Sequence, residues 1–445
     1  MRRIFLRATF TVLSMIWVWK SFERAEAALD AQVVTIGGEV RERYEFRDNA
    51  DFNSNASDTL SFVGSRIRLH LGYEVTPDIT FFFQIQDSRL FGSEVSTISN
   101  EKNLDLHQGY LKITNLAGPV TMILGRQEIF FGDHRLVGHL GWSNVGRSFD
   151  GLRLTYNPAP LRFDLWATVP KVFGTNTGAD PAFTGSNRDA QQFYGLYTTV
   201  KARIVSLEPY VMYLRDTGPI GISQITDPLA PAQNRVTLGS RIDGKVVGQS
   251  IDFTGEVAYQ TGSMNARGTT PKSDISAYAL AIKTGYTFPV MFKPRVGFEY
   301  DRASGDDNST DDEFKTFENL FHTNHLHYGY MDYMAWRNMQ DLRVSLGIKP
   351  TKVSSISLDY HLFSLAEKRD NWYRASGQVF RTTPSTNNET DLGQEINLVA
   401  YTMLKEKLRL EAGYGHFFPG DYVKVNFPTA TDDSDFLYLQ ATVSF

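Results

Sequence analysis

The 445-residue chain contains no cysteine, carries a formal net charge of −5 and has a mean hydropathy of −0.29. This composition excludes disulfide frameworks and thiolate metal sites, and its mild acidity leaves no basic surface for nucleic acid. Beyond the N-terminal segment no apolar run approaches the roughly twenty residues of a spanning helix, which excludes a helical membrane protein. Aromatic residues at 13%, together with 35 glycines, favour β-strands.

The N-terminus has the features of a secretory signal peptide. Three arginines, at positions 2, 3 and 7, precede an apolar run from residue 8 to residue 19, and Ala25-Glu26-Ala27 matches a cleavage site. The apolar run is about a dozen residues long, which is too short for a membrane anchor. We therefore expect residues 1–27 to be removed and residues 28–445 to form a single exported domain.

The rest of the chain alternates between apolar and charged residues. The pattern is clearest where Ile67, Leu69 and Leu71 alternate with Arg66, Arg68 and His70, and it recurs to the end of the chain. A soluble sandwich buries its apolar face, whereas a porin-type barrel turns that face to lipid and its charged face to a wet lumen. Because the polar faces are heavily charged, the pattern predicts a transmembrane antiparallel β-barrel.

About eighteen strands fit this pattern, an even number that suits a single-chain barrel. Their expected starts lie near residues 38, 63, 79, 105, 120, 149, 161, 191, 205, 235, 250, 275, 293, 338, 353, 390, 407 and 435. Short turns such as Thr76-Pro77-Asp78 alternate with long polar connections, which predicts short periplasmic turns and long extracellular loops. The last strand ends in Phe445 and resembles the signal that barrel assembly machinery reads.

Alternation assigns a set of basic and acidic residues to the lumen. The basic pore-lining residues, a candidate path for anions, are Arg41, Arg43, Arg66, Arg68, Lys112, Arg126, Arg153, Arg162, Arg241, Lys283, Arg295, Arg343, Lys349 and Arg409. The lumen acids are Glu39, Glu45, Asp164, Asp252, Glu256, Glu299, Asp341, Glu395 and Glu411. Two interpretations stay open: a ladder of ion pairs that stiffens the wall, and a path for a charged solute in which arginine forks bind carboxylates.

Several segments resemble the alginate-export family of outer-membrane channels. They are the runs from Gly125 to Glu128, Gly132 to Gly138, Trp142 to Asn144, Gly146 to Gly151, Tyr300 to Asp306, Thr316 to Phe321, Thr323 to His325, Tyr328 to Asp332, Asp391 to Glu395 and Gly413 to Gly420. The resemblance covers essentially the whole mature chain. It implies a monomeric eighteen-stranded barrel, a lumen whose arginines attract an acidic polysaccharide, and loops that gate each mouth.

Two clusters invite metal hypotheses. The acids Asp306, Asp307, Asp311 and Asp312 offer oxygen ligands for Ca²⁺ but lack the EF-hand spacing, so a solvated acidic loop is the simpler interpretation. The histidines His322, His325 and His327 offer ligands for a transition metal, although packing within a loop is the simpler interpretation. No cofactor is therefore expected, and the chain shows no G-x-S-x-G nucleophile motif, so we expect no enzyme activity.

The sequence thus predicts an outer-membrane channel that passes anionic carbohydrate such as an alginate-like polyuronate. Two alternatives remain, a general uptake porin for small solutes and a structural or adhesive barrel. The expected partners are outer-membrane lipids, the barrel assembly machinery and the transported anionic polysaccharide or small solute.

Overall fold

The computed structural model describes residues 33–56, 58–93, 103–172, 190–216, 232–246, 248, 250–265, 273–428 and 431–445. The expected signal peptide, residues 1–27, lies outside these ranges. No helix among the described residues is long and apolar enough to cross a membrane.

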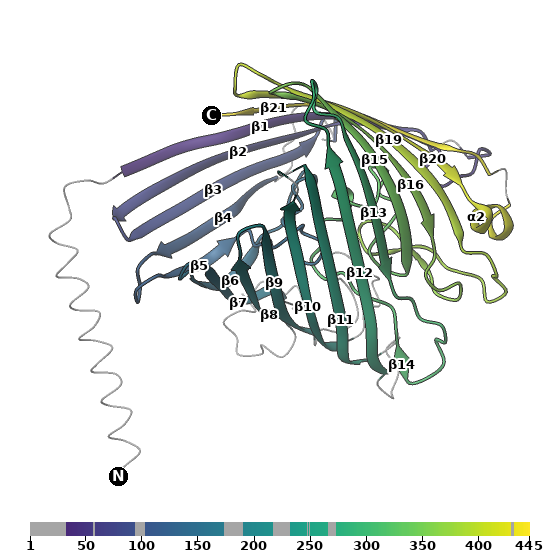
Figure 1. Cartoon of the computed structure of the whole chain (residues 1–445), viewed down its shortest axis with the longest axis horizontal. Coiled ribbons are helices and arrows are strands. Elements are labelled where there is room, and N and C mark those ends of the chain that lie inside the picture. Colours follow the sequence, from purple (N-terminus) through teal and green to yellow (C-terminus); the bar gives the residue numbers. More distant parts are fainter. Residues whose placement is uncertain are drawn as a thin grey trace, which may run out of the picture.

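Within the described residues, eighteen strands form one closed antiparallel barrel. They are β1 (Val33–Asp48), β2 (Leu60–Thr76), β3 (Ile79–Leu90), β4 (Leu104–Ile113), β5 (Val120–Gln127), β6 (Phe149–Tyr156), β7 (Leu161–Val172), β8 (Ala190–Lys201), β9 (Val205–Asp216), β10 (Gln233–Val246), β11 (Ile251–Met264), β12 (Ser273–Thr287), β13 (Arg295–Ala303), β15 (Met339–Thr351), β16 (Ser354–Ser364), β19 (Asp391–Leu404), β20 (Leu408–Pro419) and β21 (Ser434–Ser444). Each pairs with its neighbours in this order, and β1 pairs with both β2 and β21 (Figure 1). Closure leaves no unpaired strand edge in lipid, where each unsatisfied backbone group costs several kcal/mol.

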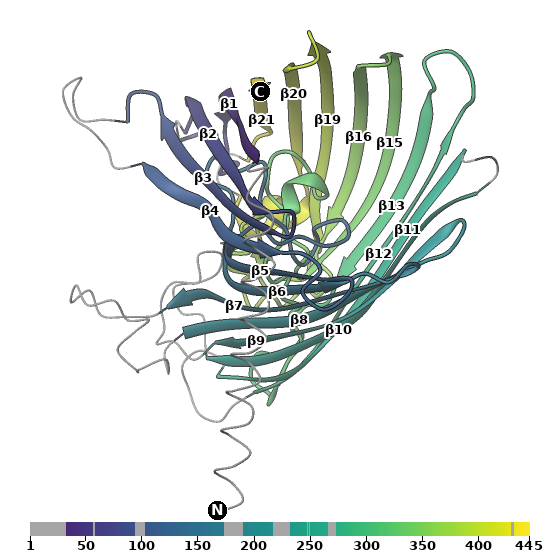
Figure 2. The ribbon, with the colours of Figure 1, turned by 90° about the vertical axis from the view of Figure 1, so that its left-hand side faces the viewer.

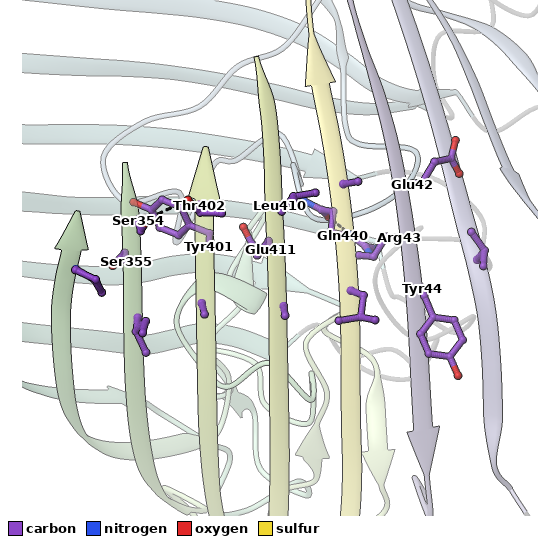
Figure 3. Close-up of a pocket in the computed structure, with 17 residues that line it drawn as sticks. Glu42, Arg43, Tyr44, Ser354, Ser355, Tyr401, Thr402, Leu410, Glu411 and Gln440 are labelled. Atoms are coloured by element: carbon purple, nitrogen blue, oxygen red, sulfur yellow. Dashed lines mark hydrogen bonds between the residues drawn. The ribbon is translucent and has the colours of Figure 1, made fainter. Parts of the chain in front are cut away.

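The two faces of the wall follow the alternation of the sequence. Leu69 in β2, Phe83 in β3 and Leu165 in β7 expose 44, 47 and 51% of their surface outward, whereas Arg68, next to Leu69, exposes 8%. In Figure 3, Arg43 and Gln440 meet between β1 and β21, with 3.5 Å between Arg43 Nη1 and Gln440 Oε1, while Tyr44 projects away from them. The apolar side chains therefore face lipid and the charged ones face the interior.

The outer surface has a groove where small residues of neighbouring strands lie side by side. Ala400, Ala412 and Ala441, on β19, β20 and β21, contribute to a shallow groove of about 680 Å³ that larger side chains such as Leu410 and Leu439 border (Figure 3). This groove belongs to the lipid-facing surface.

Connection lengths alternate as predicted. β2 and β3 are joined by residues 77–78 and β15 and β16 by residues 352–353, whereas residues 128–148 join β5 to β6 and residues 304–338 join β13 to β15. The long connections share one end of the barrel, which by the rule for outer-membrane barrels is the extracellular end. The strand starts agree with the predicted ones to within a few residues; the largest difference is at β1, which begins at residue 33 instead of 38.

Two long connections fold into the barrel instead of projecting from it. Loop A (residues 128–148) and loop B (residues 304–338, with β14, Glu313–Phe314, and the 3₁₀ helix η2, Asn324–Leu326) join through an isolated bridge between Val137 and Phe321. The Gly138 N–H donates to the Phe321 carbonyl at 2.8 Å. Figure 2 shows chain segments crossing the space that the strands enclose. An eighteen-stranded wall is too wide to fill its interior with its own side chains, and these loops fill much of it.

A third long connection covers the loops at the extracellular end. Loop C (residues 365–390) contains the short pair β17 (Trp372–Tyr373) and β18 (Val379–Arg381), and the short helix α2 (Asp421–Asn426) lies in the next long connection. Trp372 is buried, and its Nε1–H donates to the Tyr333 carbonyl of loop B at 2.9 Å. This hydrogen bond and the stacking of Tyr333 on Phe380, with 5.5 Å between ring centres, bind loop C to loop B.

Candidate functional site: the charged lumen

Arginines in the middle of β1 and β2 hold loop A against the wall. Arg41 and Arg66 both donate to the Gly141 carbonyl, at 2.8 and 3.1 Å, and Arg43 donates to the Trp142 carbonyl at 2.7 Å. The Arg43 guanidinium also lies 3.8 Å from the centre of the Trp142 ring. The predicted acids Glu39 and Glu45 pair with Arg66 and Arg43 at 2.6 and 2.7 Å, so the charges of these two arginines are neutralised where they meet the loop.

Arg68, two residues beyond Arg66 on β2, also holds loop A against the wall. Its Nε donates to Gln86 at 2.6 Å, and its Nη1 lies 3.4 Å from Glu128, the first residue of loop A. Glu128 also contacts His107 Nε2 at 2.8 Å. Burial opposes ionisation of Glu128, but its contacts with His107, His139 and Arg68 prevail and lower its pKa.

On the opposite wall the arrangement is reversed, because a loop arginine enters a cluster of wall acids. Arg135 of loop A pairs with Glu299 and lies 3.0 Å from Asp301, both on β13, and only 2% of its side chain is exposed. Its Nη1 also donates to the Tyr328 hydroxyl at 2.5 Å. Arg343 joins the cluster, 3.2 Å from Glu299 and 2.9 Å from Asp359.

Two more predicted lumen residues, Arg241 and Glu395, anchor the loops, and two others, Asp341 and Glu256, make contacts within the wall. Arg241 on β10 reaches Asp133 of loop A at 2.7 Å and Glu208 at 3.0 Å. The Glu395 carboxylate accepts the backbone N–H of Met331 in loop B at 3.1 Å. Asp341 contacts His361 at 2.8 Å, and Glu256 accepts the Tyr210 hydroxyl at 2.9 Å.

Loops A and B are joined by an arginine that has no carboxylate partner among the described residues. Arg147 of loop A donates to the carbonyls of Gly138, Phe321 and His322. Burial of its guanidinium lowers its pKa to about 9. Burial also lowers the pKa of His322 to about 3, so this histidine is neutral at physiological pH.

The periplasmic half of the lumen is different, because its basic residues remain partly exposed. The side chains of Arg162 and Arg409 expose 43 and 41% of their surface. Arg153 and Arg162 share one acid, Asp164, at 2.8 and 2.6 Å, while Arg295 pairs with Asp252 at 2.6 Å and Arg409 with Glu411 at 2.5 Å. Within the described ranges, Lys112 and Lys349 have no carboxylate within ion-pair distance, and Lys283 lies 4.0 Å from Glu299.

One predicted lumen residue is on the wrong face. Arg126 lies opposite Asp150 of β6 and shares its face with the outward-facing Leu124, which is 50% exposed. It pairs with Asp150 at 2.9 Å and lies 3.6 Å from Asp105. Arg126 is the next-to-last residue of β5 at the extracellular rim, where an outward charge costs little, so its assignment to the lumen is wrong.

Neither metal hypothesis fits the described residues, in which no group of three or more His, Asp or Glu side chains has a metal-binding arrangement. Lys315 takes the position a cation would need, since its ammonium lies 2.7, 3.3 and 3.9 Å from Asp307, Glu313 and Asp311. The three histidines have separate partners: His322 the Ala375 carbonyl, His325 the Asp332 carboxylate and His327 the Asp133 carbonyl.

Sequence reasoning missed the loop residues that fasten the interior. Arg135 and Arg147 both stand in glycine-bounded segments, Gly132–Gly138 and Gly146–Gly151, that carried the family resemblance. That resemblance was the available signal, but period-two alternation assigns roles to strand residues only.

The closed barrel, its outward apolar surface and its charged interior define an outer-membrane β-barrel channel, located in the outer membrane. The chain belongs to the alginate export family, whose model matches residues 32–435. Proteins of this porin and channel type are typically not enzymes.

Solved structures support the same fold. Pseudomonas aeruginosa OpdK is 8% identical with a TM-score of 0.58, covering 94% of this chain and 99% of OpdK. OpdL from the same organism is 11% identical (TM-score 0.58; 93 and 98% covered), and OccK11 (OpdR) is 11% identical (TM-score 0.54; 93 and 96% covered). At such identities the likeness concerns the fold alone. No curated protein sequence matches the chain.

Proposed function

We propose that this channel passes anionic carbohydrate, such as an alginate-like polyuronate, along the basic residues of the periplasmic half of the lumen. The observation that carries the proposal is the unequal pairing there. Arg153 and Arg162 share a single acid, and the predicted path residues Lys112 and Lys349 have none within ion-pair distance among the described residues. The half-exposed guanidinium of Arg162 and the ammonium groups of these two lysines therefore attract anions.

Arginine suits this role physically. Its planar fork donates two parallel hydrogen bonds to a carboxylate and stays charged at any physiological pH. The neighbouring wall acids weaken each site, and a channel needs sites that bind strongly enough to admit the solute and weakly enough to release it. A polyuronate repeats its carboxylates along the chain, so it can move from one weak site to the next.

A second candidate function is the uptake of small carboxylates. OpdK, which has a similar fold, has also been crystallised with vanillate, a small carboxylate. The specific observation in its favour is the packing of loops A and B in the interior, joined at Val137 and Phe321. A filled mid-barrel suits a small solute better than a polymer unless the loops move.

Planar-bilayer recordings of the purified channel separate these functions. In a KCl gradient the reversal potential should indicate anion selectivity. Oligouronates added to one side should interrupt the current for longer as their length increases, while neutral oligosaccharides of the same length should not. Block by monomeric carboxylates alone would favour the small-solute channel. A cation-selective or non-conducting barrel would contradict both transport functions and favour a structural barrel.

A further inference from the structure

A pocket opens at the extracellular end of the barrel where loops A, B and C meet the connection between β1 and β2. Its volume is about 600 Å³. Its lining includes the basic and aromatic residues Arg47, Trp142, His325, Arg374, Phe380 and Arg381. It lies beyond the wall arginines described above, and none of those arginines lines it.

Two arginines of this pocket have no carboxylate partner in the part of the chain that the structure describes. Arg374 and Arg381 pack on the same ring, with guanidinium carbons 4.8 and 5.0 Å from the centre of Phe380. Arg381 donates one hydrogen bond, to the Asp51 carbonyl, and its buried Nε has no partner. Burial lowers the pKa of Arg374, and the neighbouring positive charges of Arg381 and Arg47 lower it further. The pocket therefore has two positive charges in its lining without a carboxylate partner among the described residues, and this favours a bound anion.

The acids that line the pocket are already engaged. Asp332 lies 2.9 Å from His325 and 3.6 Å from Arg47. The Asp51 carboxylate accepts the Asn53 N–H at 3.0 Å, and the Asp58 carboxylate accepts the Asp51 N–H at 3.1 Å. Backbone amides and paired side chains thus hold these carboxylates, and no described carboxylate lies within ion-pair distance of Arg374 or Arg381.

The aromatic residue that would suit a sugar ring is not free to stack. One face of Trp142 is covered by Arg43, 3.8 Å from the ring centre, and its ring also stacks on His325 at 3.8 Å. Recognition in this pocket therefore depends on the acidic group of a ligand more than on its ring.

We propose that this pocket binds a carboxylate of an acidic sugar at the extracellular mouth, through the guanidinium groups of Arg374 and Arg381. The choice of an acidic sugar rests on the proposed function; the preference for a carboxylate rests on the pocket itself. The pocket is an outermost binding site, separate from the basic residues of the periplasmic half.

Calorimetric titration of the full-length channel in detergent with trigalacturonate tests this assignment. Arg374→Gln and Arg381→Gln should each weaken binding about tenfold or more, because each removes a charge-assisted hydrogen bond to the carboxylate. The matched control is Arg369→Gln, in the same loop, where Arg369 donates to the Ser385 carbonyl at 3.1 Å away from the pocket. The heat-dependent gel mobility of each variant verifies that the barrel is folded.

The result that overturns the assignment is equal affinity in Arg374→Gln, Arg381→Gln and Arg369→Gln, or no binding of trigalacturonate to the wild-type channel. Binding of the neutral trisaccharide with the same affinity would also overturn it. Its failure is distinguishable from failure of the proposed function, because the titration needs no transport. If the channel is non-selective but Arg374→Gln still loses affinity for trigalacturonate, the binding pocket is supported and the transport proposal is contradicted.

Discussion

The arginines in the middle of the barrel and those in its periplasmic half have the same residue type and face the same interior, yet their surroundings differ. Arg41 and Arg66 are buried and donate to the carbonyl of Gly141 in loop A, whereas the Arg162 and Arg409 side chains remain over two-fifths exposed. The difference arises from what lies opposite each wall segment, a folded loop in one case and open lumen in the other. An inward-facing arginine is therefore a structural anchor or a solute contact according to its distance from the loops.

The sharpest test of the anchoring region is Arg135→Ala. It leaves Glu299 and Asp301 buried without their main partner, and removal of one member of a buried ion pair costs about 3–5 kcal/mol. Urea unfolding in lipid vesicles should register this loss, and loop A should become sensitive to protease. The half-exposed Arg162→Ala serves as the control and should cost about 1 kcal/mol or less. Equal stability of the two variants would contradict the contrast between the regions.

The faces of the wall are tested by Leu69→Arg. Leu69 lies near the middle of β2 and faces lipid, where an arginine costs about 2–4 kcal/mol. The same urea titration measures the effect, with Leu69→Ile as a control that keeps the side chain apolar. If Leu69→Arg folded as stably as Leu69→Ile, the assignment of the Leu69 face of β2 to lipid would be wrong.

The inner and outer faces of the wall could be predicted from the sequence. The contacts between the wall and the loops, which distinguish the two groups of arginines, could not. Alternation placed Arg41, Arg68 and Arg343 on the inner face because each strand has only two faces and one must meet lipid. It failed at Arg126, since the rule that excludes outward charges relaxes at the rim of the membrane. It could not find the contact of Arg135 with Glu299, which joins residues 164 positions apart through a loop without periodicity.

A smaller effect concerns the acidic part of loop B. Burial, with the negative charge of Asp370 as a further contribution, raises the pKa of Asp306 to about 6. Since the folded loop favours the protonated acid, its stability should fall as the pH rises from about 4 to about 6 and then level off. Proteolysis of loop B, normalised to a denatured substrate, should therefore be faster at pH 7 than at pH 5. Asp306→Asn should remove most of this dependence, and an unchanged pH profile would contradict the assignment.

The most direct test compares two charge-neutralised channels in planar bilayers. Arg162→Gln/Arg409→Gln should move the reversal potential toward zero while the current stays steady. Arg41→Gln/Arg66→Gln removes hydrogen bonds that hold loop A, so its current should fluctuate between levels while more of the selectivity is kept. The account is contradicted if the mid-barrel variant alone loses selectivity, or if the periplasmic variant has an unchanged reversal potential.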